Sequence, residues 1–207
     1  PLSFEPYAEL CGVVFLPFFF QDRQQYQRFL NSEIFQEHIE QRLLANGIRL
    51  LNPVSNWECG SFEILFSDKA IFLPADLEGA KFRTYPSPVA IALRRALKTE
   101  PVVVEWAKVY EAFEQGEINA FLAPAAYFLS TQVYQVARYA TQIEYGYTLN
   151  LTVAINDREY LKLSPDIQQI LIQAAQDTGE FCTHFAEEQS QLDLQKLSDE
   201  FGLPIIH

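Results

Sequence analysis

The sequence predicts an α/β fold in which short strands alternate with amphipathic helices. From residue 80 onward the chain reads strand, helix, strand, helix, strand, helix. Strands that alternate with helices of roughly 10–16 residues usually form a parallel sheet with right-handed crossovers and helices on both faces. The chain has 207 residues, 49% of them hydrophobic and 14% aromatic, so it can bury a sizeable core as one large domain or two small lobes.

The first part of the chain is expected to be helical and then extended. Residues 22–47 carry apolar side chains at helical spacing, and Asn46-Gly47 provides a left-handed stop. Residues 48–58 and 61–68 have the composition of extended segments. Pro53 restricts the first of these to an edge strand or a crossover.

The middle of the chain carries the regular alternation. Its first helix has the strongest start signal, because Ser87 can act as N-cap and Pro88 then occupies the first helical position. The expected strands are 80–86, 101–106 and 118–123, and the expected helices are 87–99, 107–115 and 125–139.

A further strand is expected at residues 148–156, followed by a long helix that starts at Ser164-Pro165. The helix is either continuous or broken near Gly179. We expect its apolar face to pack on the body of the protein, through the side chains of Ile167, Ile170, Leu171 and Ala174.

The charge of the chain argues against a nucleic acid partner, and its hydropathy pattern indicates no membrane span. The formal net charge is -12 and no basic stripe is present, so we expect no nucleic acid partner. The longest apolar stretch, residues 11–20, contains Pro17 and is neither a membrane span nor a recognisable signal peptide.

Groups that could carry metal or cofactor chemistry are scarce. The three cysteines, Cys11, Cys59 and Cys182, lack a C-x-x-C spacing. The sequence is compatible with one disulfide between two of them. The three histidines do not share ligand spacing, and the sequence has no nucleophile elbow, P-loop or dinucleotide fingerprint. We therefore expect no metal, no cofactor and no enzymatic activity.

Arg83 is the residue best placed to bind a ligand. It lies at the carboxyl end of strand 80–86, directly before the helix that starts at Ser87-Pro88. Parallel α/β units bind ligands beyond the carboxyl ends of their strands, so the guanidinium and the helix dipole could face one anion. The alternative is a surface arginine paired with a nearby glutamate.

Two motifs in this region resemble a known family. The stretch "LEGAKFR" (77–83) fits L-x-G-x-K-x-R, and "WAKVYEAFEQG" (106–116) fits W-x-x-V-Y-x-A-x-x-Q-G. With "FLPFFFQDRQQYQRFL" (15–30), they resemble the extracytoplasmic solute-binding subunits of TRAP transporters, the tripartite ATP-independent periplasmic transporters. The resemblance covers nearly the whole chain.

The resemblance implies a periplasmic-binding-protein-like fold of type II, with two α/β lobes and a long helix, closing over a small organic acid. It implies that Arg83 forms a two-point salt bridge with the ligand carboxylate. It also implies a periplasmic location after removal of a signal peptide, and membrane permease subunits as partners. Family members have further segments at both ends, so we expect a fragment or processed chain with an incomplete first lobe.

The sequence departs from the family pattern where ligands are held. "EINAFLAP" (117–124) has Ala123 where the family has a ligand-contacting asparagine, with Phe121 and Leu122 beside it, and Phe62 replaces a second arginine. These replacements favour an amphipathic monocarboxylate over a polyhydroxylated or dicarboxylic ligand. We expect Arg83 to lie in a concave site with three aromatic walls and Ala123 opposite, the walls being Trp57, Phe62 and Trp106.

The expected organisation has three parts. Residues 1–57 would form a partial first lobe and hinge strand, 58–160 the second α/β lobe, and 161–207 a long connecting helix that returns to the first lobe. The favoured function is delivery of an organic acid to a permease. A degenerate relative that acts as sensor or scaffold, without transport, is the alternative.

Overall fold

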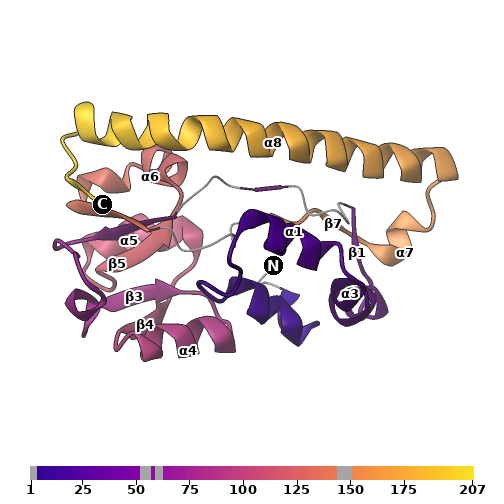
Figure 1. Ribbon diagram of the computed structural model, residues 1–207, viewed down its shortest axis with the longest axis horizontal. Helices are drawn as coiled ribbons and strands as arrows, with labels where there is room; N and C mark the ends of the chain where they lie inside the picture. Colours follow the sequence, from indigo (N-terminus) through magenta and orange to yellow (C-terminus); the bar gives the residue numbers. More distant parts are fainter. Residues whose placement is uncertain (1–3, 52–56, 59–62, 144–150) are drawn as a thin grey trace. The chain divides into compact units, whose positions relative to one another are not determined.

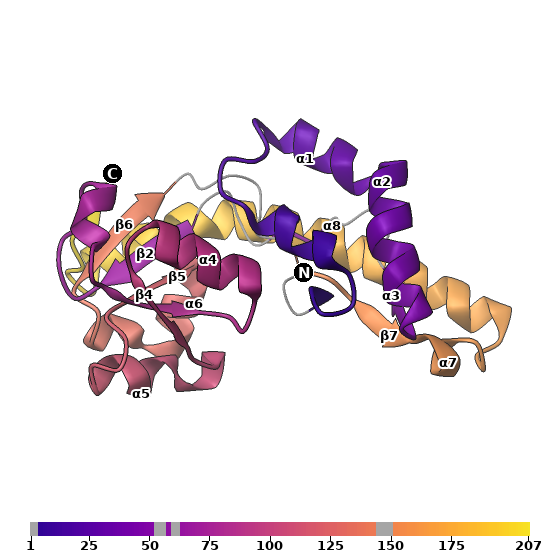
Figure 2. The same cartoon turned by 90° about the horizontal axis from the view of Figure 1, so that it is seen from below.

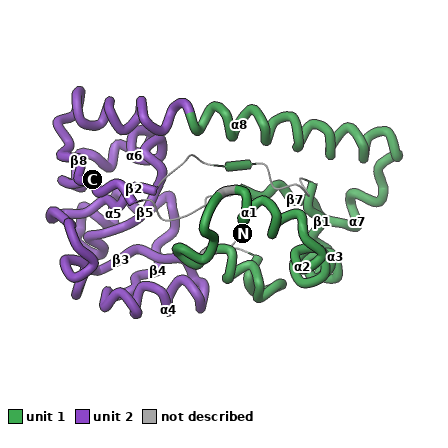
Figure 3. The backbone as a smooth tube through the Cα atoms, in the orientation of Figure 1, with its two compact units in different colours: residues 1–59, 146–187 green, residues 60–145, 188–207 purple. Residues whose placement is uncertain are grey.

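The computed structural model describes residues 4–51, 57–58, 63–143 and 151–207. The chain forms two compact units, shown in two colours in Figure 3. Unit 1 comprises residues 1–59 and 146–187, and unit 2 comprises residues 60–145 and 188–207. These boundaries differ from the expected ones, because residues 146–160 group with unit 1 and residues 188–207 group with unit 2.

Unit 2 is built on a six-stranded mixed sheet with the order β4-β3-β5-β2-β6-β8. The strands β3, β4 and β5 are parallel, as expected, and β8 is parallel to β6. Strand β2 runs antiparallel to both of its neighbours, β5 and β6. The strands are β2 (Glu63–Ser67), β3 (Lys81–Thr84), β4 (Glu100–Val103), β5 (Ala120–Ala123), β6 (Tyr139–Ile143) and β8 (Ile205–Ile206).

Helices cover both faces of this sheet (Figure 1). The helix α4 (Pro88–Ala96) packs Leu93 on one face, against Leu65 and Phe82. The helices α5 (Val109–Glu114) and α6 (Ala125–Thr131) cover the other face, where Phe66 and Phe128 stack with ring centroids 3.6 Å apart. Short helical turns η4 (Pro74–Leu77), η5 (Trp106–Lys108) and η6 (Val133–Gln135) connect these elements.

The start of α4 is confirmed, since the Ser87 side chain accepts a hydrogen bond from the Ala90 amide at 3.1 Å. The expected helix at 125–139 is wrong in its second half. Gln132 takes a left-handed conformation with a φ of 58°, which ends α6. Residues from Tyr139 onward then pair with β2 as strand β6.

Unit 1 begins with the turn η2 (Glu9–Phe15) and a series of short helical segments. The expected single helix at 22–47 is interrupted, because Ser32 leaves the helical conformation and caps a second start, accepting from the Phe35 amide at 3.2 Å. Figure 2 shows the change of direction between α1 and α2. The segments are α1 (Arg23–Leu30), α2 (Glu33–Phe35), the π-helical turn η3 (Gln36–Glu40) and α3 (Gln41–Ala45).

A two-stranded antiparallel sheet follows, formed by β1 (Ile48–Leu50) and β7 (Ala154–Asn156). The expected strand at 148–156 therefore pairs in unit 1, and its residues 148–150 lie outside the described part of the chain. The helix α7 (Asp157–Tyr160) comes next. Cys11 and Cys182 are free thiols, whereas Cys59 lies outside the described residues.

The long helix α8 (Pro165–Asp199) is continuous through Gly179. The expected packing face is wrong for Ile167, Ile170 and Ala174, which are exposed. Leu171 is half-buried and packs on the core around Tyr160 and Ala175, as expected. The buried face is shifted around the helix to Ala175, Gly179 and Thr183. On this face, the Ala175 carbonyl accepts a hydrogen bond from Trp57 and the Thr183 hydroxyl accepts one from the Glu58 amide.

Candidate ligand-binding site

Arg83 is buried inside unit 2, near the end of strand β3. Its position in the register opposite Val102 of β4 places it on an inner strand of the sheet. The residue is only 4% exposed, and its Nε donates a hydrogen bond to the backbone carbonyl of Val104 at 2.9 Å. This bond fixes the side chain against the loop that follows β4.

Two aromatic rings enclose the guanidinium. The Cζ atom of Arg83 lies 4.0 Å from the ring centroid of Tyr85 and 3.8 Å from that of Trp106. Arginine stacks favourably on aromatic faces, most strongly when water is excluded. The two rings therefore hold the guanidinium plane in one orientation.

Tyr127 extends this aromatic enclosure. Its ring lies 4.5 Å from that of Trp106, and its hydroxyl donates to the Trp106 carbonyl at 2.7 Å. Burial raises the pKa of Tyr85 and of Tyr127, although the Arg83 charge acts in the opposite direction on both. Both phenols therefore stay protonated at neutral pH and neither neutralises the arginine.

Arg83 has no carboxylate partner within the described part of the chain. The ion pairs found there are Arg49–Asp157, Lys98–Glu78, Lys162–Glu159 and Lys196–Glu200. An arginine offers five N–H donors, and a buried cation without a counter-ion is costly unless other groups compensate it. The alternative of a surface arginine paired with a glutamate does not describe Arg83.

Of the other predicted site residues, Trp106 lies beside Arg83. Ala123 on β5 lies in the apolar core that Trp106 packs against. Trp57 belongs to unit 1, where its Nε1 donates to the Ala175 carbonyl at 2.7 Å. Phe62 lies outside the described residues.

Phe121 and Leu122, expected to make a ligand cleft apolar, serve as core residues. Phe121 is fully buried and its ring contacts that of Phe66 at 5.3 Å. Leu122 belongs to the cluster on the other face of the sheet, with Phe82. Their side chains therefore fill the interior of unit 2.

Sequence reasoning missed Tyr85 and Tyr127. Tyr85 follows Arg83 by two residues, and this spacing places both side chains on one face of an extended segment. That signal could have identified Tyr85. Tyr127 is in the first turn of α6, and only the packing of α6 on Trp106 brings it to the site.

A buried pair of opposite charges lies on the α4 side of the sheet and was also missed. Burial raises the pKa of Glu63 to about 7, although the Arg94 guanidinium acts to lower it. Arg94 is 4% exposed, its Cζ lies 4.1 Å from the Phe82 ring centroid, and its Nε has no hydrogen-bond partner. This cluster lies on the opposite side of β3 from Arg83.

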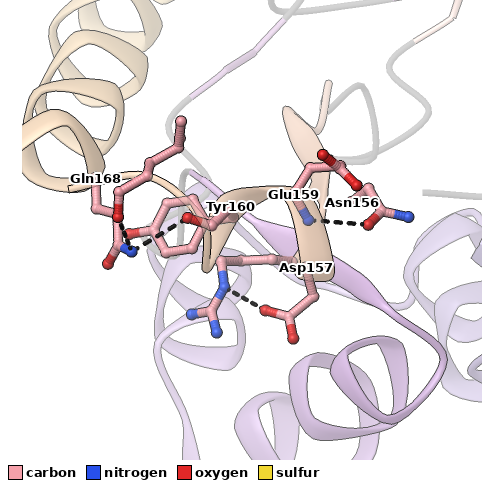
Figure 4. A network of polar contacts seen from close by, with 7 residues as sticks. Asn156, Asp157, Glu159, Tyr160 and Gln168 are labelled. Carbon is pink, nitrogen blue, oxygen red and sulfur yellow. Dashed lines mark hydrogen bonds and ion pairs between the residues drawn. The ribbon is translucent and has the colours of Figure 1, made fainter. Parts of the chain in front are cut away.

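A polar network in unit 1 joins β1, α7 and the start of α8 (Figure 4). Arg49 Nε donates to Asp157 at 2.7 Å, and its guanidinium lies 4.6 Å from the Tyr160 ring centroid. The Gln168 amide donates to the carbonyls of Tyr160 and Leu163. These contacts tie β1, α7 and the start of α8 together, which indicates a structural role.

The described residues contain no group of three or more histidine, cysteine, aspartate or glutamate side chains arranged to hold a metal ion. Within the same residues, no helix combines the length and the apolar character required to cross a membrane.

Comparison with protein families gives a match over the whole chain. Residues 1–207 match the model of the bacterial extracellular solute-binding proteins, family 7, also called DctP. The chain belongs to this family. Its members are binding proteins of transporters rather than enzymes, and the membership confirms the resemblance to TRAP solute-binding subunits and the periplasmic location expected from it.

Curated relatives are similar at a modest level of identity. The 2,3-diketo-L-gulonate-binding periplasmic protein YiaO of Escherichia coli is 28% identical over 99% of this chain and 60% of its own length. The C4-dicarboxylate-binding periplasmic protein DctP of Rhodobacter capsulatus is 26% identical over 89% of this chain and 54% of its own length. The chain thus spans little more than half of these relatives.

Solved structures confirm the type II periplasmic-binding fold. A TRAP periplasmic solute-binding protein from Sulfitobacter, with bound alpha-D-taluronate, is 22% identical and superposes with a TM-score of 0.86 over 100% of this chain and 66% of that one. A Pseudomonas aeruginosa homologue with bound L-malate is 20% identical, with a TM-score of 0.87 over 99% and 69%. The Bordetella pertussis receptor DctP7, which binds pyroglutamic acid, is 19% identical, with a TM-score of 0.82 over 99% and 65%.

Proposed function

We propose that the protein is the solute-binding subunit of a TRAP transporter and binds an organic acid through Arg83, for delivery to a membrane permease. The observation that carries the proposal is the Arg83 guanidinium, which is held between two aromatic rings without a carboxylate partner in the described part of the chain. Nε donates to Val104, and a side-chain hydrogen bond joins Arg83 to Tyr85, so further guanidinium N–H groups can provide the planar pair of donors that suits a carboxylate.

The ligands named for the relatives support this chemistry. 2,3-Diketo-L-gulonate, taluronate, malate and pyroglutamate all carry at least one carboxylate at neutral pH. One fixed cation suits the carboxylate that these ligands share, and surrounding residues that differ between relatives suit the part of each ligand that varies. We extend this common feature to the present chain.

The aromatic enclosure favours an amphipathic monocarboxylate. Tyr85, Trp106 and Tyr127 offer apolar ring surface beside the single cation, and apolar contact contributes roughly 25 cal/mol per Å² that is buried. The contribution of Trp57, Phe62 and Ala123 to ligand binding stays a prediction.

A thermal-shift screen of the 207-residue chain against organic acids tests the proposal. Each acid is paired with its primary amide, which has nearly the same shape and no charge. A ligand that binds the folded state raises the melting temperature, so we expect shifts for acids and none for their amides. Pyroglutamate and a phenyl-substituted monocarboxylate represent ligands without a second charge, and malate represents a dicarboxylate.

Equal shifts for acids and amides would contradict the role of Arg83 in carboxylate binding. A larger shift for malate than for the monocarboxylates would contradict the specificity and leave the role of Arg83 intact. Absence of any shift would favour the alternative of a relative that acts as scaffold, consistent with the low exposure of Arg83.

A further inference from the structure

The segment between β4 and α5, residues 104–108, supplies two of the groups that contact Arg83. The Val104 carbonyl accepts from its Nε at 2.9 Å, and the Trp106 indole lies 3.8 Å from its Cζ. Both groups move with this segment, because one is part of its backbone and the other is attached to it two residues later. The position of the β4–α5 segment therefore determines how the guanidinium is held.

A side chain from another element fixes the β4–α5 segment. The Tyr127 hydroxyl donates to the Trp106 carbonyl at 2.7 Å, and its ring meets the indole edge-on, with centroids 4.5 Å apart. Tyr127 lies in the first turn of α6, shortly after β5 ends. Because β5 is parallel to β3, both strands end at the same edge of the sheet, which is where Arg83 lies.

The fold of unit 2 does not depend on this hydrogen bond. Ala125 and Phe128 bury α6 in the core, where Phe128 stacks on Phe66. The Trp106 carbonyl also accepts from the Val109 amide, so it keeps a partner when the hydroxyl is removed. Loss of the hydroxyl alone should therefore leave the helices in place and loosen the β4–α5 segment.

A two-point contact with a carboxylate is sensitive to such loosening. Two N–H groups must point at two oxygens at once, and hydrogen bonds weaken as they leave their preferred direction. When the β4–α5 segment shifts, the Val104 carbonyl and the Trp106 indole shift with it. The guanidinium then loses the fixed orientation that both contacts impose on it.

We infer that Tyr127 is a positioning residue for ligand binding: its hydroxyl holds the β4–α5 segment, and through this segment the Arg83 guanidinium, in the orientation that receives a carboxylate. The inference rests on the proposed function. It adds a residue that lies outside the two motifs at 77–83 and 106–116.

The variant Tyr127→Phe tests the inference, because it removes only the hydroxyl. Isothermal titration with an acid from the screen should give an affinity about three- to tenfold below that of the wild type, which is typical of one lost hydrogen bond. Tyr110→Phe is the matched control, since the Tyr110 hydroxyl donates to Gln135 at 3.3 Å and its ring packs on the same core. This control should bind as the wild type does. Circular dichroism and melting temperature establish that both variants fold.

A double-mutant cycle tests whether Tyr127 acts through Arg83. In the Arg83→Lys background the two-point contact is already lost, so Tyr127→Phe should weaken binding of the same acid no further. An undiminished loss in this background would instead indicate that Tyr127 contacts the ligand directly.

A measurement without ligand follows Arg83 itself. Its Nε–H is buried and bonded to Val104, so it should exchange slowly with solvent in heteronuclear NMR spectra. The signal is assigned by its absence from the Arg83→Lys spectrum. Exchange should be faster in Tyr127→Phe and unchanged in Tyr110→Phe.

Three results would each overturn the inference: unchanged exchange at Arg83 in Tyr127→Phe, an affinity equal to that of the wild type, or an undiminished further loss in the Arg83→Lys background. Absence of acid binding by the wild type is a different outcome, since it overturns the proposed function. The exchange measurement then still decides whether Tyr127 holds Arg83.

Discussion

Arg83 shows, at the residue scale, how a buried charge can be held without a protein counter-ion. One backbone carbonyl and two aromatic faces compensate part of the lost hydration. Aromatic faces cannot accept the full set of guanidinium hydrogen bonds. The remaining donors are therefore suited to an incoming anion.

Replacement of Arg83 by lysine should weaken acid binding by about 1.5–3 kcal/mol, more than tenfold, because the ammonium keeps the charge and loses the planar pair of donors. Isothermal titration with an acid from the screen measures this change. Arg95→Lys is the matched control, since Arg95 lies exposed on α4. Equal affinity of the Arg83→Lys variant and the wild type would exclude the proposed two-point contact.

Glu63 should make stability depend on pH. Burial raises its pKa from 4.5 to about 7, so the folded state retains a proton that the unfolded state has already lost between these values. The resulting stabilisation is complete below the unfolded pKa and is lost as pH rises through about 7. Urea denaturation should therefore give a falling free energy of unfolding as pH rises.

The variant Glu63→Gln should remove most of that fall, because the amide does not titrate. Glu78→Gln serves as control, since Glu78 forms an exposed pair with Lys98. If the free energy of unfolding fell equally with pH in Glu63→Gln and in the wild type, Glu63 would not retain its proton in the folded protein.

At the scale of single elements, α4 depends on its first residue. Ser87 is buried and caps the helix through the Ala90 amide. Ser87→Ala should cost about 1–2 kcal/mol, because the amide loses its acceptor away from water. Ser130→Ala, an exposed position in α6, should change the free energy of unfolding by less than about 0.5 kcal/mol. Similar losses in both variants would argue against a specific role of the cap.

Elements with strong local signals could be predicted from the sequence, whereas features that depend on long-range strand pairing could not. The N-cap and proline of α4 and the Ser164-Pro165 start of α8 were visible in the sequence. The sequence "YATQI" of β6 follows a helical pattern without a glycine or proline between them, so its strand character was hidden. The antiparallel direction of β2 was equally hidden, because pairing partners far apart in the chain decide it.

The same division holds for the candidate site. Arg83 and Trp106 were predictable because family motifs carry them, and the structure brings them together. Phe121 and Leu122 were judged as cleft residues from their motif position, whereas the alternation of β5 directs them into the two cores on either face of the sheet. Tyr127 required the tertiary packing of α6 and could not be read from spacing alone.

At the scale of the whole molecule, the buried residues divide between the two units. Among the described residues, Tyr26 and Leu43 belong to a core in unit 1, and Phe66 and Phe128 belong to a core in unit 2. Cooperative unfolding follows shared cores. Each unit should therefore respond mainly to substitutions in its own core.

Phe66→Ala and Leu43→Ala test this independence. Each removes a fully buried side chain and should destabilise its own unit by about 2–5 kcal/mol. Hydrogen exchange followed by mass spectrometry should show lost protection in peptides from residues 63–143 for the first variant and from residues 23–50 for the second. Loss of protection throughout the chain in either variant would indicate one cooperative unit.

The position of Trp106 against Arg83 also gives the protein a built-in optical reporter. The sequence contains only two tryptophans, and the indole of Trp106 lies 3.8 Å from the guanidinium carbon, whereas Trp57 is hydrogen-bonded in unit 1. An anion that draws the guanidinium away from the ring would change the electric field at the indole and shift its emission. A Trp57→Phe variant would thus report occupancy of the site by its intrinsic fluorescence, without any attached label.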